Sequence, residues 1–272
     1  MAHNYTPLGR SSVTFIHDLL FEVEPSWFSF AERLYFWPMS RLAVRAVAVA
    51  TSSRTEAARM ERLHPGLSPV HPIGLAVATE LRAAVPSRPT SVAGLESFAL
   101  SVGRLNARKN LVNAILGTHA SGRLSPSSPL LVVGSAEYSG VGAALPPAVE
   151  RLVDERSVVF LGRVSDGELR WLYEHAAVTI YCSLDEGFGL PPVEAAAFGS
   201  PLVVSDRPIF RETVREHAVF ADPLDPASIA AAVDSTWGTR GRGRGGRSPV
   251  EYSWIETVDR LRELCATAAS RH

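Results

Sequence analysis

The sequence is almost without lysine. Of its 27 basic residues, 26 are arginine and a single one, Lys109, is lysine. With 28 acidic residues the net charge is −1, which gives no electrostatic reason to expect a nucleic acid as partner. Two cysteines are too few for a disulfide framework or a cysteine-based metal site. We find no signal peptide and no apolar run of about 18 residues, so the sequence predicts no membrane span and a cytoplasmic protein.

From residue 98 onward, β-branched apolar runs alternate with helical segments. Strands are predicted at 98–103, 129–134, 157–161, 178–183, 201–205 and 217–221. Helices are predicted at 108–119, 146–155, 166–176, 192–199, 208–215 and 226–237. This alternation predicts an α/β fold with a Rossmann-type, doubly wound parallel sheet.

The first ninety residues contain fewer strands, which are predicted at VTFIHD (13–18), AVAVATSS (46–53) and PVHPIGL (69–75). An aromatic helical stretch at 27–45, interrupted by Pro38, separates the first two, and we favour packing on a core for it over contact with a membrane surface. Linkers are predicted at 78–96 and 239–249, and an amphipathic helix at 252–270. We therefore expect a shortened N-terminal α/β domain at 1–90, a larger Rossmann-type domain at 91–250 and a C-terminal helix at 251–272.

Residues 185–196 read DEGFGLPPVEAA and follow a predicted strand, with a helix expected to begin near Pro191 or Pro192. Open α/β sheets bind ligands at such strand-to-helix turns. The glycines would let an anion approach a helix N-terminus, and the carboxylates of Glu186 and Glu194 suit sugar hydroxyls. The alternative is that Glu194 merely complements the helix dipole and Glu186 is solvated.

Lys109 lies in FALSVGRLNARKNLVNAI (98–115), where a strand and a glycine precede a basic helix start. Cations are disfavoured at this end of a helix dipole unless an anion is present. A lysine ammonium binds diphosphate oxygens as a point charge, and an arginine such as Arg104 binds them as a fork. We therefore favour an anion site here over a solvated helix start.

Four segments resemble the GT-B retaining glycosyltransferases of glycosyltransferase family 4. EGFGLPPVE matches the E-x7-E motif of that family, and VGRLNARKN matches its G-R-L-x-x-x-K-N diphosphate segment. VVFLGRVSDGELRWLYEHA (158–176) matches its base-binding strand and helix, and TFIHDLLFEVEPSWFS (14–29) matches its first-domain H-D-L segment. The resemblance covers nearly the whole chain and implies two Rossmann-type domains, with a nucleotide-sugar donor bound at 91–250.

The resemblance also implies how the donor diphosphate is held. Arg104 and Lys109, which follow Gly103, would neutralise the diphosphate and stabilise it as a leaving group. Backbone N–H groups of the turn would meet the phosphates and the donor sugar; these residues are Gly187, Phe188, Gly189 and Leu190.

Other residues are implied to contact the sugar and the base. Glu186 would lie beside the donor sugar, and Glu194 would hold the ribose hydroxyls. The main chain near Arg163 and Val164 would meet the base. His17, at the end of a first-domain strand, would face the donor sugar, and the resemblance implies a catalytic part for His17, Glu186, Arg104 and Lys109.

The activity implied is retaining transfer of a hexose from a GDP- or UDP-linked sugar to a glycan, lipid-linked or small-molecule acceptor. The run HDL-x-F-x-x-x-P-x-W-F-S favours mannose, while UDP-glucose and dTDP-sugars remain open. We expect no cofactor and no metal, because no Asp-x-Asp motif is present. The alternatives are a non-catalytic or partner-dependent donor-binding subunit and, less favoured, a nucleotide-sugar epimerase or a phosphorylase.

The amino-terminal end departs from the family pattern. The first domain of relatives opens with a strand and a glycine-rich loop, whereas here only Gly9 precedes the first predicted strand. The start could have been placed too far downstream, or the chain could be a short form. A third explanation is a homodimer or another partner that supplies the missing strands, because an incomplete sheet exposes an unpaired edge. Peripheral membrane contact also stays open.

Overall fold

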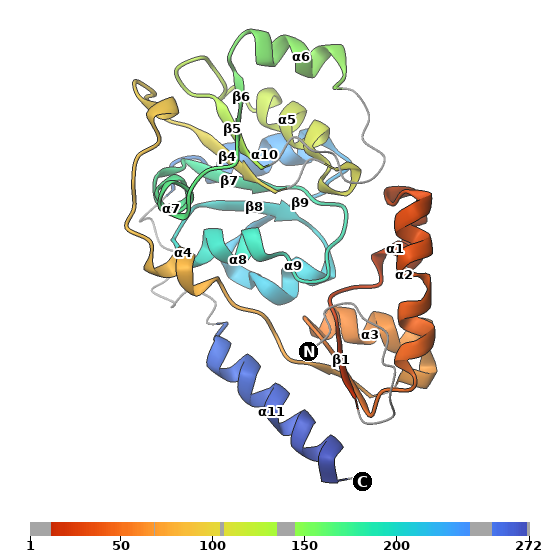
Figure 1. The fold of residues 1–272 in the computed structure, drawn as a ribbon. Coiled ribbons are helices and arrows are strands. Elements are labelled where there is room, and N and C mark those ends of the chain that lie inside the picture. The colour runs from red at the N-terminus through yellow and green to blue at the C-terminus, as the bar shows by residue number, and fades with distance from the viewer. Residues whose placement is uncertain (1–11, 68, 104–105, 135–144, 240–251, 271–272) are drawn as a thin grey trace. The chain divides into compact units, whose positions relative to one another are not determined.

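The computed structural model describes residues 12–67, 69–103, 106–134, 145–239 and 252–270 (Figure 1). The chain divides into two compact units, described separately below. Unit 1 comprises Met1–Ala76, Asp185–Gly189 and Tyr252–His272, and unit 2 comprises Val77–Leu184 and Leu190–Glu251. No helix in the described ranges combines the length and the apolar character that crossing a bilayer requires.

Unit 2 is built on a six-stranded sheet in which all neighbouring strands run parallel, in the order β6-β5-β4-β7-β8-β9. The strands are β4 (Ala99–Val102), β5 (Leu130–Val133), β6 (Val158–Gly162), β7 (Val178–Tyr181), β8 (Leu202–Ser205) and β9 (Val219–Ala221). Each overlaps one of the six predicted runs, so the expected α/β fold with a doubly wound parallel sheet is confirmed. The strand order reverses between β4 and β7, where such sheets bind ligands at their carboxyl ends.

Helices cover the sheet of unit 2 (Figure 1). They are α4 (Thr79–Ala83), α5 (Leu111–Ala120), α6 (Pro147–Asp154), α7 (Asp166–His175), α8 (Leu190–Ala197), α9 (Pro208–Thr213) and α10 (Pro226–Thr236), with 3₁₀ turns at Thr90–Val92, Ala107–Lys109 and Arg215–His217. Helix α4 lies inside the segment expected to be a linker at 78–96, and it packs against α7. From residue 240 on, the predicted glycine-arginine linker lies outside the described residues.

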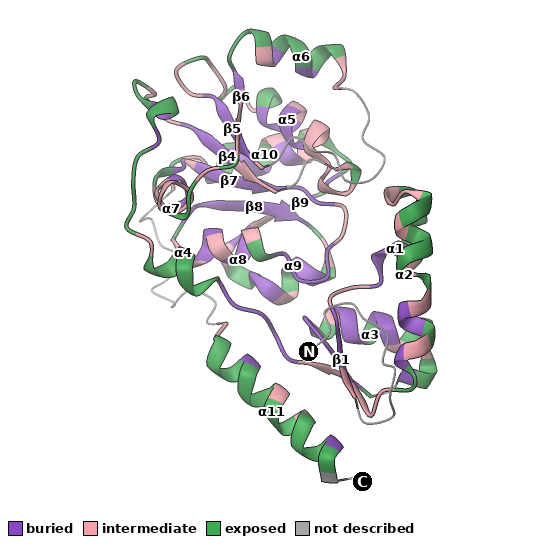
Figure 2. Ribbon diagram, in the orientation of Figure 1, coloured by how far each residue is buried: buried purple, intermediate pink, exposed green. Residues whose placement is uncertain are grey.

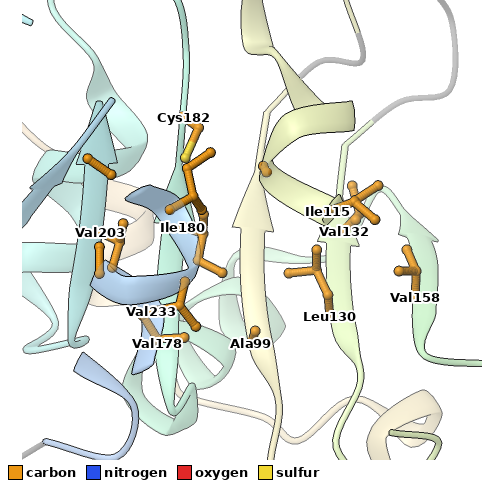
Figure 3. Packing of buried hydrophobic residues seen from close by; sticks show 14 of the residues in the cluster. Ala99, Ile115, Leu130, Val132, Val158, Val178, Ile180, Cys182, Val203 and Val233 are labelled. Carbon is orange, nitrogen blue, oxygen red and sulfur yellow. The ribbon is translucent and has the colours of Figure 1, made fainter. Parts of the chain in front are cut away.

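The core of unit 2 lies between the central strands and the helix pair α5 and α10 (Figure 3). Strands β5, β7 and β8 are buried along their whole length (Figure 2), and their apolar side chains, many of them β-branched, fill both faces of the sheet. Helices α5 and α10 approach closely at Gly117, where an added Cβ would lie 2.6 Å from the Ile229 side chain. Cys182 belongs to this cluster, which agrees with a packing role for its thiol.

Unit 1 contains a three-stranded parallel sheet in the order β1-β2-β3. The strands are β1 (Val13–Ile16), β2 (Ala48–Thr51) and β3 (Val70–Pro72), and they fall within the three predicted runs. The helices are α1 (Leu20–Val23), α2 (Phe30–Ala43), α3 (Arg54–Leu63) and α11 (Trp254–Ser270), with 3₁₀ turns at Pro25–Trp27 and Pro65–Leu67. Helix α11 contacts β1 and β2.

The predicted interruption at Pro38 is wrong, because α2 continues through that residue. The helix begins at a complete capping box, in which Ser29 accepts from the N–H of Glu32 and the Glu32 carboxylate accepts from the N–H of Ser29. Its buried side, with Met39 and Ala43, packs on the core of unit 1. Tertiary packing thus outweighs the hydrogen bond that a proline removes from a helix.

Candidate functional site

The carboxyl ends of β4 and β7 form a small hollow in unit 2. It is lined by Val102, Gly103, Lys109, Leu111, Tyr181 and Cys182, among others. Because β4 and β7 are adjacent and parallel, the loops that follow them leave the sheet at the same edge. The structure therefore brings the predicted residues Gly103 and Lys109 together at the reversal of strand order.

Lys109 is held by a turn rather than by a regular helix. The side chain of Asn106 accepts a hydrogen bond from the Lys109 N–H at 3.1 Å. The Lys109 ammonium donates to the hydroxyl of the buried Tyr181. Gly103 has a φ of +151°, which favours glycine, and an added Cβ would lie in contact with Lys109 Cε at 3.4 Å. The only lysine of the chain thus lines the hollow at the end of the sheet.

Asn110 explains why the helix predicted from residue 108 begins only at Leu111. Its φ of +53° is left-handed, which asparagine tolerates better than most residues, and it separates the 3₁₀ turn from α5. Its side-chain amide donates to the carbonyl oxygens of Cys182 at 3.1 Å and Pro223 at 2.6 Å. Asn110 therefore ties the lysine turn to the segments after β7 and β9. Sequence reasoning assigned Asn110 no such role, although its place beside Lys109 in the K-N pair was a usable sign.

For the remaining predicted residues of the diphosphate and base segments, the structure gives little more than the position relative to a strand or helix. Arg104 lies outside the described residues. Arg163 and Val164 follow β6 directly, at the carboxyl edge of the same sheet, and Arg163 is exposed. Leu190 is the first residue of α8, close to the predicted helix start at Pro191 or Pro192.

Glu194 lies on α8 and is anchored by one of its carboxylate oxygens. The hydroxyl of Tyr173, a fully buried residue of α7, donates to Glu194 Oε2 at 2.9 Å. Burial raises the pKa of the Glu194 carboxyl, and the Tyr173 hydrogen bond works in the opposite direction. A partly buried carboxylate that one hydroxyl already orients is suited to accept hydrogen bonds from further hydroxyls.

The turn Asp185–Gly189 belongs to unit 1, so the two glutamates of the E-x7-E motif lie in different units. The carbonyl oxygen of Gly187 accepts from the hydroxyls of Ser52 at 3.0 Å and Ser53 at 2.7 Å. An added Cβ on Gly187 would lie 2.6 Å from the carbonyl oxygen of His17. The glycine is thus required by close approach to the end of β1, and the structure brings His17 and this turn together.

The other residues of the turn are also enclosed within unit 1. Glu186 is only 7% exposed, and its N–H donates to Asp185 Oδ1 at 2.8 Å. The Phe188 ring contacts the Tyr252 ring edge-on, with centroids 4.9 Å apart. Gly189 has a φ of +83°, a conformation that glycine adopts without strain. Sequence reasoning missed the two serines, Ser52 and Ser53, which follow β2 and fix the turn.

A second group that sequence reasoning missed is an ion-pair cluster on α3. Arg59 lies between Glu56 and Asp185, with both nitrogen–oxygen distances at 2.6 Å. No pattern in the sequence joins residues 126 positions apart, so only the fold shows this cluster. Within the described ranges, no group of three or more His, Cys, Asp or Glu side chains could hold a metal ion.

Comparison with known proteins gives the fold a context. The Anabaena protein HepE, solved in complex with UDP and glucose, superposes with a TM-score of 0.65 at 19% identity, covering 95% of this chain and 71% of that one. Sucrose-phosphate synthase from Thermosynechococcus elongatus gives a TM-score of 0.62 at 22% identity, covering 95% and 65%. These likenesses confirm the expected GT-B-like α/β architecture.

Two curated relatives are mannosyltransferases of O-antigen chains. RfbU of Salmonella typhimurium is 29% identical over 235 residues, which is 85% of this chain and 62% of that protein. O-antigen chain mannosyltransferase B of Escherichia coli is 33% identical over 170 residues, which is 58% of this chain and 43% of that protein. The chain thus spans less than two thirds of the length of these relatives.

A family model covers most of unit 2. The model described as glycosyl transferases group 1 matches residues 88–237, more than half of the chain. This range contains the lysine turn, the hollow at β4 and β7, and Glu194 on α8. The chain therefore belongs to the glycosyl transferases of group 1.

Proposed function

We propose that this protein transfers a hexose, with mannose favoured, from a nucleotide-diphosphate sugar to a glycan or lipid-linked acceptor and retains the anomeric configuration. The observation that carries the proposal is Lys109, the only lysine, lining the hollow where the strand order reverses. The names of the O-antigen relatives support mannose, and GDP-mannose is the donor proposed first.

In the proposed reaction Lys109 faces the leaving diphosphate. Negative charge develops on that group as the bond to the sugar breaks, and a fixed cation stabilises it. Arg104 is proposed to act together with Lys109, so that side-chain charge rather than a metal ion neutralises the diphosphate. Activity in the presence of a chelator is therefore expected to equal activity without it.

The remaining residues are proposed to orient the donor. Glu194, already oriented by Tyr173, accepts hydrogen bonds from the ribose hydroxyls. Glu186 and His17 lie beside the donor sugar. The main chain near Arg163 contacts the base. Because backbone groups make this contact, no side chain indicates which base is bound.

The proposed setting is the cytoplasmic face of a membrane, and α2 supports it. Phe30, Leu34 and Trp37 are exposed at helical spacing, although sequence reasoning favoured core packing for this stretch. The guanidinium groups of Arg33 and Arg41 lie over the Phe30 and Trp37 rings, 6.0 and 4.6 Å from their centroids. Aromatic and arginine side chains together favour an anionic lipid surface. Flotation with vesicles containing phosphatidylglycerol tests this contact. If α2 instead binds a second copy of the chain or another partner, the mass of the protein measured in solution will be larger than that of one chain.

The proposed function is tested by release of GDP or UDP from GDP-mannose and UDP-glucose, with and without glycan or lipid-linked acceptors. Acceptor-dependent release with a retained anomer, followed by NMR of the product, is the expected result. A donor that binds without turnover over a panel of acceptors would instead support a non-catalytic donor-binding subunit. Absence of donor binding would contradict both.

A further inference from the structure

Unit 1 contains a charged cluster that the proposed chemistry does not use directly. Glu56 is 0% exposed and Arg59 is 8% exposed, and they lie one turn apart on α3. One terminal nitrogen of the Arg59 guanidinium donates to Glu56 Oε2 at 2.6 Å. The other donates to Asp185 Oδ2, also at 2.6 Å. The guanidinium thus joins α3 to the turn Asp185–Gly189.

The cluster continues to the backbone on both sides. Asp185 Oδ1 accepts from the N–H of Glu186 at 2.8 Å, so the residue that Arg59 holds also fixes the main chain of Glu186. Glu56 Oε1 accepts from the N–H of Leu19 at 2.9 Å, which ties the segment after β1 to the same helix. The segment after β1 carries His17. The main-chain positions of Glu186 and of the segment that carries His17 therefore both depend on the buried Glu56–Arg59 pair. Glu186 and His17 are the two residues proposed to lie beside the donor sugar.

This arrangement is costly if stability is its only purpose. Three carboxylates, Asp18, Glu56 and Asp185, surround one guanidinium. Burial and the charges of Asp18 and Asp185 raise the pKa of Glu56 to about 8, although Arg59 opposes the shift. Buried ion pairs are often replaced by apolar side chains without loss of stability, so a pair of this kind is better explained by the geometry it fixes.

We propose that Arg59 is a positioning residue for the turn that carries Glu186, and that buried Glu56 orients Arg59 for this purpose. The inference rests on the proposed function, because it takes Glu186 to contact the sugar of the donor. Arg59 then acts through Asp185 and not on the substrate itself. Its loss should weaken recognition of the sugar while leaving recognition of the nucleotide intact.

The test compares binding of GDP and of GDP-mannose by calorimetry in the full chain. In Arg59→Gln we expect GDP-mannose to bind about tenfold more weakly and GDP to bind within about twofold of the unchanged protein. Asp185→Asn should reproduce this selective loss, and the double variant should lose no more than either single variant, because both changes break one linkage. Arg59→Lys should recover part of the loss.

Arg262→Gln is the matched control. Arg262 also pairs with a carboxylate three residues away on a helix of unit 1, Asp259 at 3.3 Å, but this pair is exposed. The control should bind both ligands normally. Equal weakening of GDP and GDP-mannose in Arg59→Gln, or a lowered unfolding midpoint in both cluster variants, would show a merely structural role and overturn the inference. Unchanged binding of both ligands would overturn it as well.

The two proposals fail in different ways. If the unchanged protein binds neither GDP, UDP nor their sugars, the proposed function fails and the inference fails with it. If the unchanged protein binds GDP-mannose more tightly than GDP and Arg59→Gln does the same, only the inference fails.

Discussion

The two units each place one cation differently. In unit 2, Lys109 lines a hollow and its ammonium donates to a neutral phenol, the hydroxyl of Tyr181. In unit 1, Arg59 is enclosed between two carboxylates at 2.6 Å each. A cation that lines a hollow adds positive potential to it, whereas a cation between carboxylates fixes their positions. In the proposed reaction, unit 2 supplies charge to the ligand and unit 1 supplies geometry.

The largest expected effect is at Lys109. We expect Lys109→Ala to lower hexose transfer at least ~100-fold, since removal of one contact to developing charge costs about 3–4 kcal/mol of transition-state stabilisation. Steady-state kinetics give the loss, and circular dichroism should show an unchanged fold. Arg123→Ala, which removes an exposed ion pair with Asp234 in the same unit, serves as control. Near-normal turnover in Lys109→Ala would contradict the claim that Lys109, unlike Arg59, supplies charge to the ligand.

Glu194 should make nucleotide binding depend on pH. Its carboxyl group accepts hydrogen bonds more strongly when it is ionised, and burial raises its pKa, so affinity should fall as the pH drops through this raised value. We expect Glu194→Gln to lose this pH dependence and to bind roughly tenfold more weakly at neutral pH, because a hydrogen bond to a charged group contributes about 1.5–3 kcal/mol. Titration calorimetry between mildly acidic and neutral pH measures both.

Tyr173→Phe sharpens the Glu194 prediction. The Tyr173 hydroxyl lowers the pKa of Glu194, so its removal should move the loss of affinity to higher pH. A pH profile identical to that of the unchanged protein would mean that Glu194 does not contact the nucleotide.

Gly187 tests the geometric role of unit 1. In Gly187→Ala the new Cβ would meet the carbonyl oxygen of His17 at 2.6 Å, so the turn or the end of β1 must move. We expect a loss of about 1–3 kcal/mol in unfolding free energy, typical of overpacking a close contact, and weaker donor binding. Gly66→Ala is the control, because its added Cβ would meet only Val44 Cγ1 at 3.5 Å. Denaturant unfolding distinguishes the two, and equal stability would contradict the close approach.

The smallest effect concerns one thiol in each unit. Cys265 is exposed on α11, whereas Cys182 is 1% exposed and burial raises the pKa of its thiol to about 12. We expect a maleimide to label Cys265 alone in the native protein, without changing nucleotide binding. Mass spectrometry after digestion locates the label. Rapid labelling of Cys182 would show that the core of unit 2 opens readily.

Unit 2 was predictable because its strands are local apolar runs and its motifs are contiguous. Lys109 and Gly103 lie in one short segment, so the single lysine, its strand-glycine-helix context and the family motif all pointed to them. The predicted start of α5 was wrong, because a single left-handed residue such as Asn110 does not change the hydrophobic periodicity from which helices are predicted. Unit 1 was harder to predict. The partners of Gly187 at Ser52 and Ser53, and of Asp185 at Arg59, lie more than 120 positions away and meet only in the fold.

The central claim is that the lysine turn of unit 2 binds the diphosphate of a nucleotide. It is tested most directly by calorimetric titration with UDP, GDP, ADP and dTDP of the unchanged chain and of Lys109→Ala. We predict that one nucleotide, with GDP favoured, binds the unchanged chain and binds the variant about 10- to 100-fold more weakly, because an interaction with a charged group contributes about 1.5–3 kcal/mol. Equal binding by both proteins, or binding of none of the four nucleotides, would contradict the claim.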